Sequence, residues 1–137
     1  MVKRILAVLA GVIAGVALVQ ATDMLSGKLY PPPAGIDFNN KEALKEMISN
    51  MPTNAFVLHL IGYAIASFVG GLVATLVADN NEPRAAMITG GVLMVAGIMN
   101  VMSLPGHPVW FIVASTLAYV PAAYVGYLLA RKKGAAA

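Results

Sequence analysis

The sequence contains no cysteine. It therefore cannot form a disulfide, hold a metal or an iron–sulfur cluster through thiolates, or use a thiol as a nucleophile. Glycine-rich phosphate-binding loops are also missing, because the glycine pairs at 70–71 and 90–91 lie inside apolar runs and do not follow a strand. These absences exclude many enzyme classes. We expect a non-enzymatic protein with no catalytic residue, no bound metal and no cofactor.

Charge is sparse as well: Asp, Glu, Lys and Arg make up 11% of the chain, against about 25% in soluble domains. What the chain has instead is apolar length, with 59% hydrophobic residues and a mean hydropathy of +0.78. The charges lie at the ends of the chain and between four apolar runs, at 5–22, 54–78, 85–104 and 109–130. Each run is long enough to cross a bilayer. We expect an all-α membrane protein, a single domain over 1–137, whose four transmembrane helices form two hairpins.

The basic residues predict the orientation in the membrane. Six of them would share one side of the bilayer, namely Lys3, Arg4, Arg84, Arg131, Lys132 and Lys133. Only Lys28, Lys41 and Lys45 would lie on the other side. Since Lys and Arg accumulate on the cytoplasmic side, both termini should be cytoplasmic. The net charge of +3 then reflects orientation and not nucleic-acid binding, because no aromatic residues interleave the basic ones.

The first apolar run also fits a cleavable signal peptide, because it follows Lys3 and Arg4 and ends at Asp23. A retained helix is the better interpretation. Ala7, Gly11 and Gly15 recur every fourth residue and form a row of small side chains, which suits close contact with another helix.

The longest polar stretch, 23–53, is expected on the outer face of the membrane. Its segment YPPPAG, residues 30–35, must be extended because each proline fixes φ and disfavours helix in the residue before it. An amphipathic helix is predicted over about 40–51, with Asn39 as its cap and Glu42 three residues on. Its apolar face would hold Leu44, Met47, Ile48 and Met51. Such a helix should lie at the membrane surface or cover the bundle.

Small residues recur every fourth position in two further spans. The predicted packing residues are Gly11 and Gly15 in the first span, Gly62, Ala66, Gly70 and Ala74 in the second, and Ala118, Ala122 and Gly126 in the fourth. The second-span row continues to Ala78, and the fourth-span row runs from Ala114 to Ala130. Because such a row slants around its helix, one partner should meet only two or three members. The leading hypothesis is therefore a homo-oligomer, or an accessory or structural subunit of a larger membrane complex.

A second row on the second span is partly polar, and consists of His59, Tyr63, Ser67, Gly71 and Thr75. It could line a path in a small permeation or carrier protein for a neutral or lipidic substrate. The favoured interpretation is packing, with hydroxyl groups bonded to backbone carbonyls or across helices. No charged residue lies in the middle of a span, which counts against ion-coupled transport.

Four polar residues are predicted at one depth near the outer surface: Asp23, His59, Asn100 and His107. Together they could bind a divalent metal or haem, or exchange protons beside a quinone. Alternatively they bond only to one another and to water. Their spacing matches no specific metal-binding motif.

The order of these features resembles a group of small bacterial four-helix inner-membrane proteins. The resemblance rests on a first span ending in an acidic residue, on the YPPPAG-type outer loop at 30–35, and on the His-Pro-x-Trp-Phe corner at 107–111. It implies a bacterial inner membrane. It implies no activity and no binding residues.

Overall fold

The computed structural model describes residues 2–79, 82–103 and 106–131, and none of these residues forms a strand. The helices are α1 (Val2–Leu29), α2 (Lys41–Ser49), α3 (Thr53–Ala78), α4 (Arg84–Ser103) and α5 (Val109–Ala130). The protein is therefore all-α, as predicted. In this described part, α1, α3, α4 and α5 are long and apolar enough to cross a membrane, as in a multi-pass membrane protein. Leu104, Lys132 and Lys133, which entered the predictions, lie outside the described residues.

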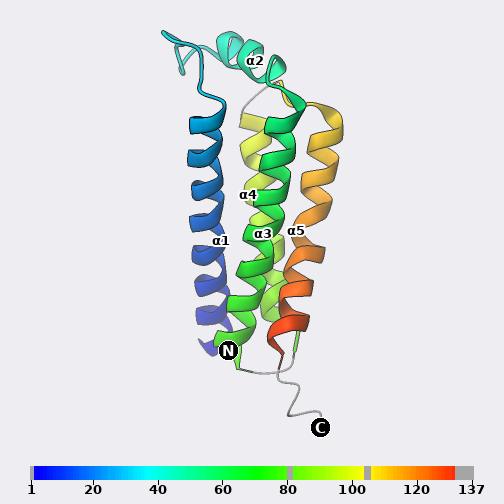
Figure 1. Cartoon of the computed structure of the whole chain (residues 1–137). Coiled ribbons are helices and arrows are strands. Elements are labelled where there is room, and N and C mark those ends of the chain that lie inside the picture. The colour runs from blue at the N-terminus through cyan, green and yellow to red at the C-terminus, as the bar shows by residue number, and fades with distance from the viewer. Residues whose placement is uncertain (1, 80–81, 104–105, 132–137) are drawn as a thin grey trace.

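The four long helices form one elongated bundle (Figure 1). Helix α1 begins and α5 ends at the same end of the bundle, and α2 lies across the opposite end, here called the α2 end (Figure 1). Helix α3 packs against α1 and α5, while α4 packs against α5, α3 and α1. The hairpin partners α1 and α3 are therefore neighbours, as are α4 and α5, and the parallel helices α3 and α5 join the two hairpins.

The apolar run of the first span ends at Asp23, but its helix does not. Helix α1 continues through Asp23 to Leu29, and the amide of Tyr30 still donates to the Ser26 carbonyl at 2.7 Å. Residues 24–30 contain no proline, so nothing in them interrupts the helical hydrogen bonds. The helix stops where Pro31 disfavours helical geometry in Tyr30. The expectation that residue 23 begins the connecting loop is thus wrong, and Asp23 projects from a helix.

Helix α2 is capped by a different residue from the one expected. The side chain of Asn40, not Asn39, accepts hydrogen bonds from the amides of Glu42 and Ala43, at 3.0 and 3.3 Å. Asn39 instead donates its own amide to Asp37, at 2.9 Å. Helix α2 buries Leu44 and Ile48 and leaves its charged side chains exposed. Its apolar face therefore points toward the end of the bundle.

The row of small residues on α3 packs against α1 along its whole length. A Cβ added to Gly11 would lie 2.6 Å from the Gly70 carbonyl oxygen and 2.9 Å from the Ala74 Cβ. Of the other members of the row, Gly62 lies against Thr22 and Ala66 against Gly15, while Ala78 belongs to the same buried cluster as Ala7 of α1. The expectation of two or three contacts was wrong, because the two backbones approach so closely that even members at the edge of the row remain within reach.

The α3–α5 contact uses a different row from the one predicted on α5. Ala114, Ala118, Ala122 and Ala130 are half-buried, and of that row only Gly126 is buried, against the Phe68 carbonyl of α3. The buried face of α5 is made by Phe111, Ser115, Tyr119, Ala123, Gly126 and Tyr127. Gly71 of α3 lies directly against the Ala123 backbone. The α5 contact is therefore shifted by one residue toward larger side chains.

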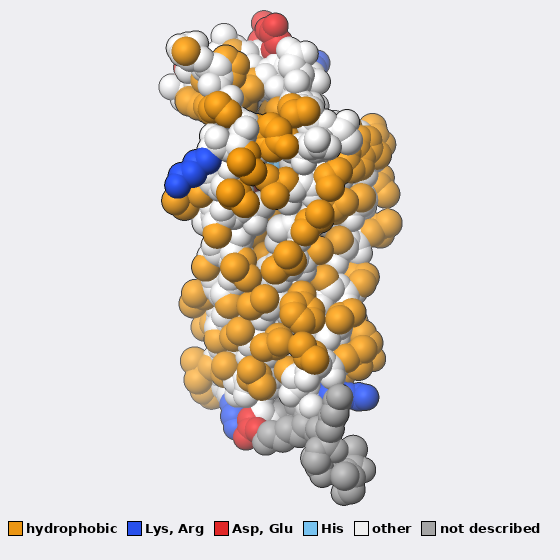
Figure 2. Space-filling model, viewed as in Figure 1, with side chains coloured by type: hydrophobic (Ala, Val, Ile, Leu, Met, Phe, Trp, Pro, Cys, Tyr) orange, Lys and Arg blue, Asp and Glu red, His pale blue; other side chains and the backbone are white. Residues whose placement is uncertain are grey.

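Hydrophobic side chains cover the length of the bundle visible in Figure 2, and charged side chains lie at or near its two ends. At the end opposite α2, Lys3 pairs with Asp79 at 3.5 Å and Arg4 with Glu82 at 3.7 Å. These two exposed pairs link the start of α1 to the α3–α4 connection. An apolar middle between two charged ends is the surface that a bilayer requires.

Candidate functional site

A cavity of about 960 Å³ lies at the α2 end of the bundle. Its floor is formed by the ends of α1, α3, α4 and α5, and its cover by the proline segment 30–36 and α2. All four residues of the predicted polar cluster line this cavity, namely Asp23, His59, Asn100 and His107. Asp23 and His107, which are 84 positions apart in the sequence, thus line the same cavity.

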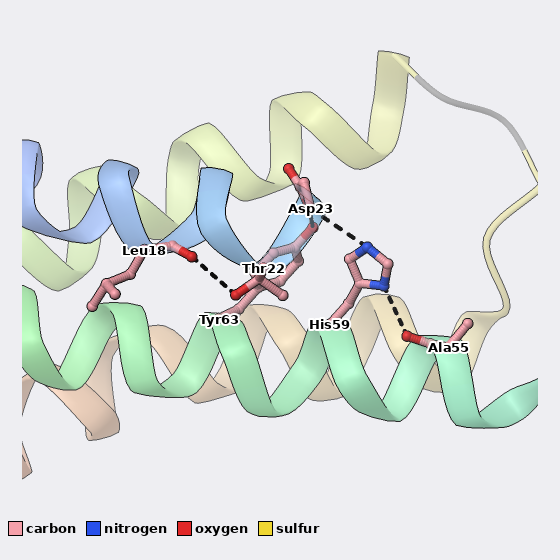
Figure 3. A network of polar contacts seen from close by, with 6 residues as sticks. All are labelled: Leu18, Thr22, Asp23, Ala55, His59 and Tyr63. Atoms are coloured by element: carbon pink, nitrogen blue, oxygen red, sulfur yellow. Dashed lines mark hydrogen bonds and ion pairs between the residues drawn. The ribbon is translucent and has the colours of Figure 1, made fainter. Parts of the chain in front are cut away.

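Within this lining, Asp23 and His59 are in direct contact (Figure 3). The Nε2 atom of His59 lies 3.5 Å from Asp23 Oδ1, and its Nδ1 atom lies 2.8 Å from the Ala55 carbonyl oxygen. A carbonyl oxygen can only accept, so Nδ1 carries a hydrogen and donates it. The remaining nitrogen, Nε2, therefore faces the carboxyl group.

The two side chains can share a proton across this contact. With the proton on Nε2 an imidazolium would face a carboxylate, and with the proton on Asp23 a neutral imidazole would face a carboxylic acid. Either arrangement would give the pair a total charge of zero. A pair that holds one proton would therefore be neutral.

Tyr63 completes the network. Its hydroxyl donates to Asp23 Oδ1 at 3.3 Å, and its ring lies 5.7 Å from the His59 ring. On its other side the Tyr63 ring stacks on Tyr119 of α5, at 6.2 Å between centroids. Immediately before Asp23, the Thr22 hydroxyl donates to the Leu18 carbonyl at 2.9 Å (Figure 3). Three helices thus hold the position of the Asp23 carboxyl group.

Asn100 and His107 occupy other parts of the same wall. Asn100 is exposed near the end of α4. The His107 ring stacks on Phe111, with 5.5 Å between centroids, and meets the edge of Phe56 at 6.1 Å. His107 therefore lies in an aromatic environment, whereas His59 lies in a polar one.

The hydrogen bond between Tyr63 and Asp23 was not predicted from the sequence, which placed Tyr63 only in the partly polar row. The two residues are 40 positions apart, so no local pattern links them. A signal was present, because Tyr63 follows His59 by four residues and so shares its helix face. Phe56 and Phe111, which line the cavity, were also missed as site residues.

The character of the lining restricts what the cavity can hold. It is largely apolar, with aromatic side chains from Tyr30, Phe38, Phe56, Tyr63 and Phe111. Its titratable groups include two carboxyl groups, Asp23 and Glu46, and two imidazoles. The residues that line the cavity include neither Lys nor Arg. The described part of the chain contains no group of three or more His, Cys, Asp or Glu residues arranged to hold a metal ion.

The other residues of the partly polar row on α3 make packing contacts within the bundle. The Ser67 hydroxyl donates to the Tyr119 carbonyl, and the Thr75 hydroxyl donates to the Gly71 carbonyl at 2.8 Å. Ser67 and Thr75 are buried, and Gly71 touches the Ala123 backbone. These contacts favour the packing interpretation of the row over that of a substrate path.

Fold and site together define a class: the residues that the structure describes form an all-α protein with four potential membrane spans and a covered cavity at one end. Comparison with known proteins adds no family to this description. No protein-family model, curated protein or solved structure matches the chain. The resemblance based on residues 30–35 and 107–111 therefore stays a prediction.

Proposed function

We propose that this protein resides in the bacterial cytoplasmic membrane and binds an amphiphilic small molecule in the cavity at its α2 end. Both termini would be cytoplasmic, following the distribution of Lys and Arg, so the cavity would open on the outer side. The single observation that carries this proposal is the cavity itself. A largely apolar space of about 960 Å³ with a few convergent polar groups is the usual form of a small-molecule site.

The position of the cavity supports an amphiphile in particular. The helix ends that form its floor would lie near the headgroup level of a bilayer, where apolar and polar surroundings meet. A ligand with an apolar body could enter from the lipid, and its polar group could reach Asp23. The apolar face of α2, with Leu44 and Ile48 buried, would cover the bound molecule.

Binding is a better proposal than catalysis because both nitrogens of His59 are engaged. Nδ1 donates to the Ala55 carbonyl, and Nε2 faces Asp23. A general base must instead direct a free nitrogen at the group that it activates. The arrangement suits recognition of a polar group and exchange of a proton with it.

The proposed function can be tested by what the protein retains during purification. Met47 of α2 lines the cavity, so Met47→Trp should fill part of it, whereas Met99 on α4 is 64% exposed and lies outside it. Protein purified in mild detergent should release an amphiphile on denaturation, detected by mass spectrometry. We expect this species in wild type and in Met99→Trp but not in Met47→Trp. Equal small-molecule content in all three proteins would contradict the proposal.

A second candidate is self-association or membership of a larger membrane complex. The row of small residues on α3 packs against α1 of the same chain. Ala118 and Ala122 of α5, in contrast, are only half-buried. These two small side chains could support close approach by another transmembrane helix. If they do, Ala118→Leu should convert a complex seen by native mass spectrometry to a monomer. A wild-type protein that is monomeric in its native membrane would exclude this candidate.

A further inference from the structure

The Asp23–His59 pair and the charge of the cavity lining point to a specific class of ligand. We propose that the cavity binds a lipophilic monocation in exchange for the proton shared by Asp23 and His59. This inference rests on the proposed function, because it names the ligand of the same cavity.

The lining distinguishes between ligand charges. Moving an ion into an apolar cavity is unfavourable unless an opposite charge or polar partners compensate for its lost hydration. Asp23 offers negative charge for a cation. The basic residues at this end of the bundle are Lys28, Lys41 and Lys45, and all three are exposed and absent from the lining. An anionic amphiphile, such as a fatty acid, would find no basic side chain on the cavity wall.

The aromatic side chains of the lining supply its apolar surroundings. Phe56, Phe111 and Tyr63 are 5%, 2% and 7% exposed, and their rings pack on one another, on His107 and on Tyr119. The Asp23 carboxyl group therefore supplies the charge that favours a cation with an apolar body over a neutral molecule of the same shape.

The shared proton links cation binding to pH. While the pair holds its proton it is neutral, so a bound cation would remain uncompensated. When the proton leaves to water, Asp23 stays ionised and His59 neutral, and the cation takes over the positive charge. One proton is released for each cation bound, and the charge of the site is unchanged by the exchange.

The tyrosines around Asp23 do not alter this count at neutral pH. Tyr63 from α3 faces Asp23, and Tyr119 from α5 lies behind Tyr63. Tyrosine hydroxyls ordinarily keep their protons up to about pH 10. The cavity adds Glu46 from α2, His107 from the 106–108 segment, and the uncharged Asn100 from α4. Glu46→Gln and His107→Gln are the control variants for these two side chains, and both should keep the pH dependence of binding.

The test uses two probes with the same apolar body and opposite charge, tetraphenylphosphonium and tetraphenylborate, together with neutral triphenylphosphine oxide. Binding to the full chain in lipid nanodiscs can be followed by calorimetry. The fluorescence of Trp110, the only tryptophan, gives a second readout because its ring lies 6.2 Å from that of Phe56. We expect the phosphonium to bind most tightly and the borate not to bind.

The affinity for the phosphonium should rise about tenfold for each pH unit over the range in which the pair holds its proton. Asp23→Asn should weaken phosphonium binding at least about tenfold and abolish this pH dependence. Asp37→Asn is the matched control, because Asp37 is an exposed carboxylate of the α1–α2 connection that does not line the cavity. It should bind like wild type. The wild-type pH dependence needs no variant and remains informative if Asp23→Asn fails to fold.

The possible outcomes separate the two proposals. Equal binding of all three probes, or tightest binding of the neutral probe, would overturn the cation inference and leave an amphiphile-binding cavity in place. Cation binding without pH dependence would overturn the proton exchange. If no probe binds and Met47→Trp also leaves the copurified small molecules unchanged, the proposed function itself falls.

Discussion

Gly71 of α3 lies against the backbone of Ala123 of α5, so close that an added Cβ would meet the Ala123 carbonyl group. This contact joins the two hairpins of the bundle. It also explains why a glycine stands in the middle of an apolar helix, where glycine is otherwise unfavourable by about 1 kcal/mol relative to alanine.

We therefore predict that Gly71→Ala destabilises the protein by about 1–3 kcal/mol, the usual cost of inserting a methyl group into a tight contact. Gly91→Ala is the control, since an added Cβ at Gly91 would meet no atom within 4 Å. It should be neutral or slightly stabilising, because alanine favours helix. Reversible unfolding in mixed micelles measures both variants. Equal stability of the two would show that the α3–α5 contact is looser than described.

Removing the Tyr63 hydroxyl should also have a measurable cost. Tyr63→Phe keeps the ring that stacks on Tyr119 but loses the hydrogen bond to Asp23. We expect a loss of about 0.5–1.5 kcal/mol in the free energy of unfolding. Tyr124→Phe, which changes a tyrosine that is 40% exposed, should have a smaller effect. In an Asp23→Asn background the cost of Tyr63→Phe should shrink, and an unchanged cost would mean that the two side chains are not coupled.

The cap of α2 provides a test of the cover over the cavity. Asn40→Ala removes the side chain that accepts from two amides at the start of this helix, which should cost about 1 kcal/mol of local stability. Hydrogen exchange of residues 41–49 should then accelerate. Asn39→Ala should leave exchange unchanged, because Asn39 contributes its backbone amide, not its side chain, to the bond with Asp37. If hydrogen exchange of residues 41–49 accelerated in Asn39→Ala and not in Asn40→Ala, Asn39 would be the cap of α2.

The orientation in the membrane can be measured directly because the sequence has no cysteine. We predict that Lys41→Cys is labelled by a membrane-impermeant maleimide in intact cells, whereas Arg131→Cys is labelled only after the membrane is permeabilised. Both side chains are exposed, so burial does not limit the reaction. The unmodified protein gives the background. The opposite labelling pattern would place the cavity on the cytoplasmic side.

Much of the fold was predictable because hydropathy and helix breaks are local properties. The spans predicted at 54–78 and 109–130 correspond to Thr53–Ala78 and Val109–Ala130, since prolines or polar residues flank each run. The first helix was predicted too short, because Asp23 ends an apolar run without ending a helix. The sequence also predicted a common depth for Asp23, His59, Asn100 and His107, because each lies near the end of a span.

The sequence by itself therefore determined an all-α chain with four apolar helices and a polar, proline-containing connection that carries a short amphipathic helix. Only the tertiary structure decided that the α3 row packs on α1 along its length, that Tyr63 and His59 both meet Asp23, and that α2 covers a cavity above them. The physical reason is that composition and periodicity act over a few residues. Which helix faces meet depends on the close packing of all four helices at once.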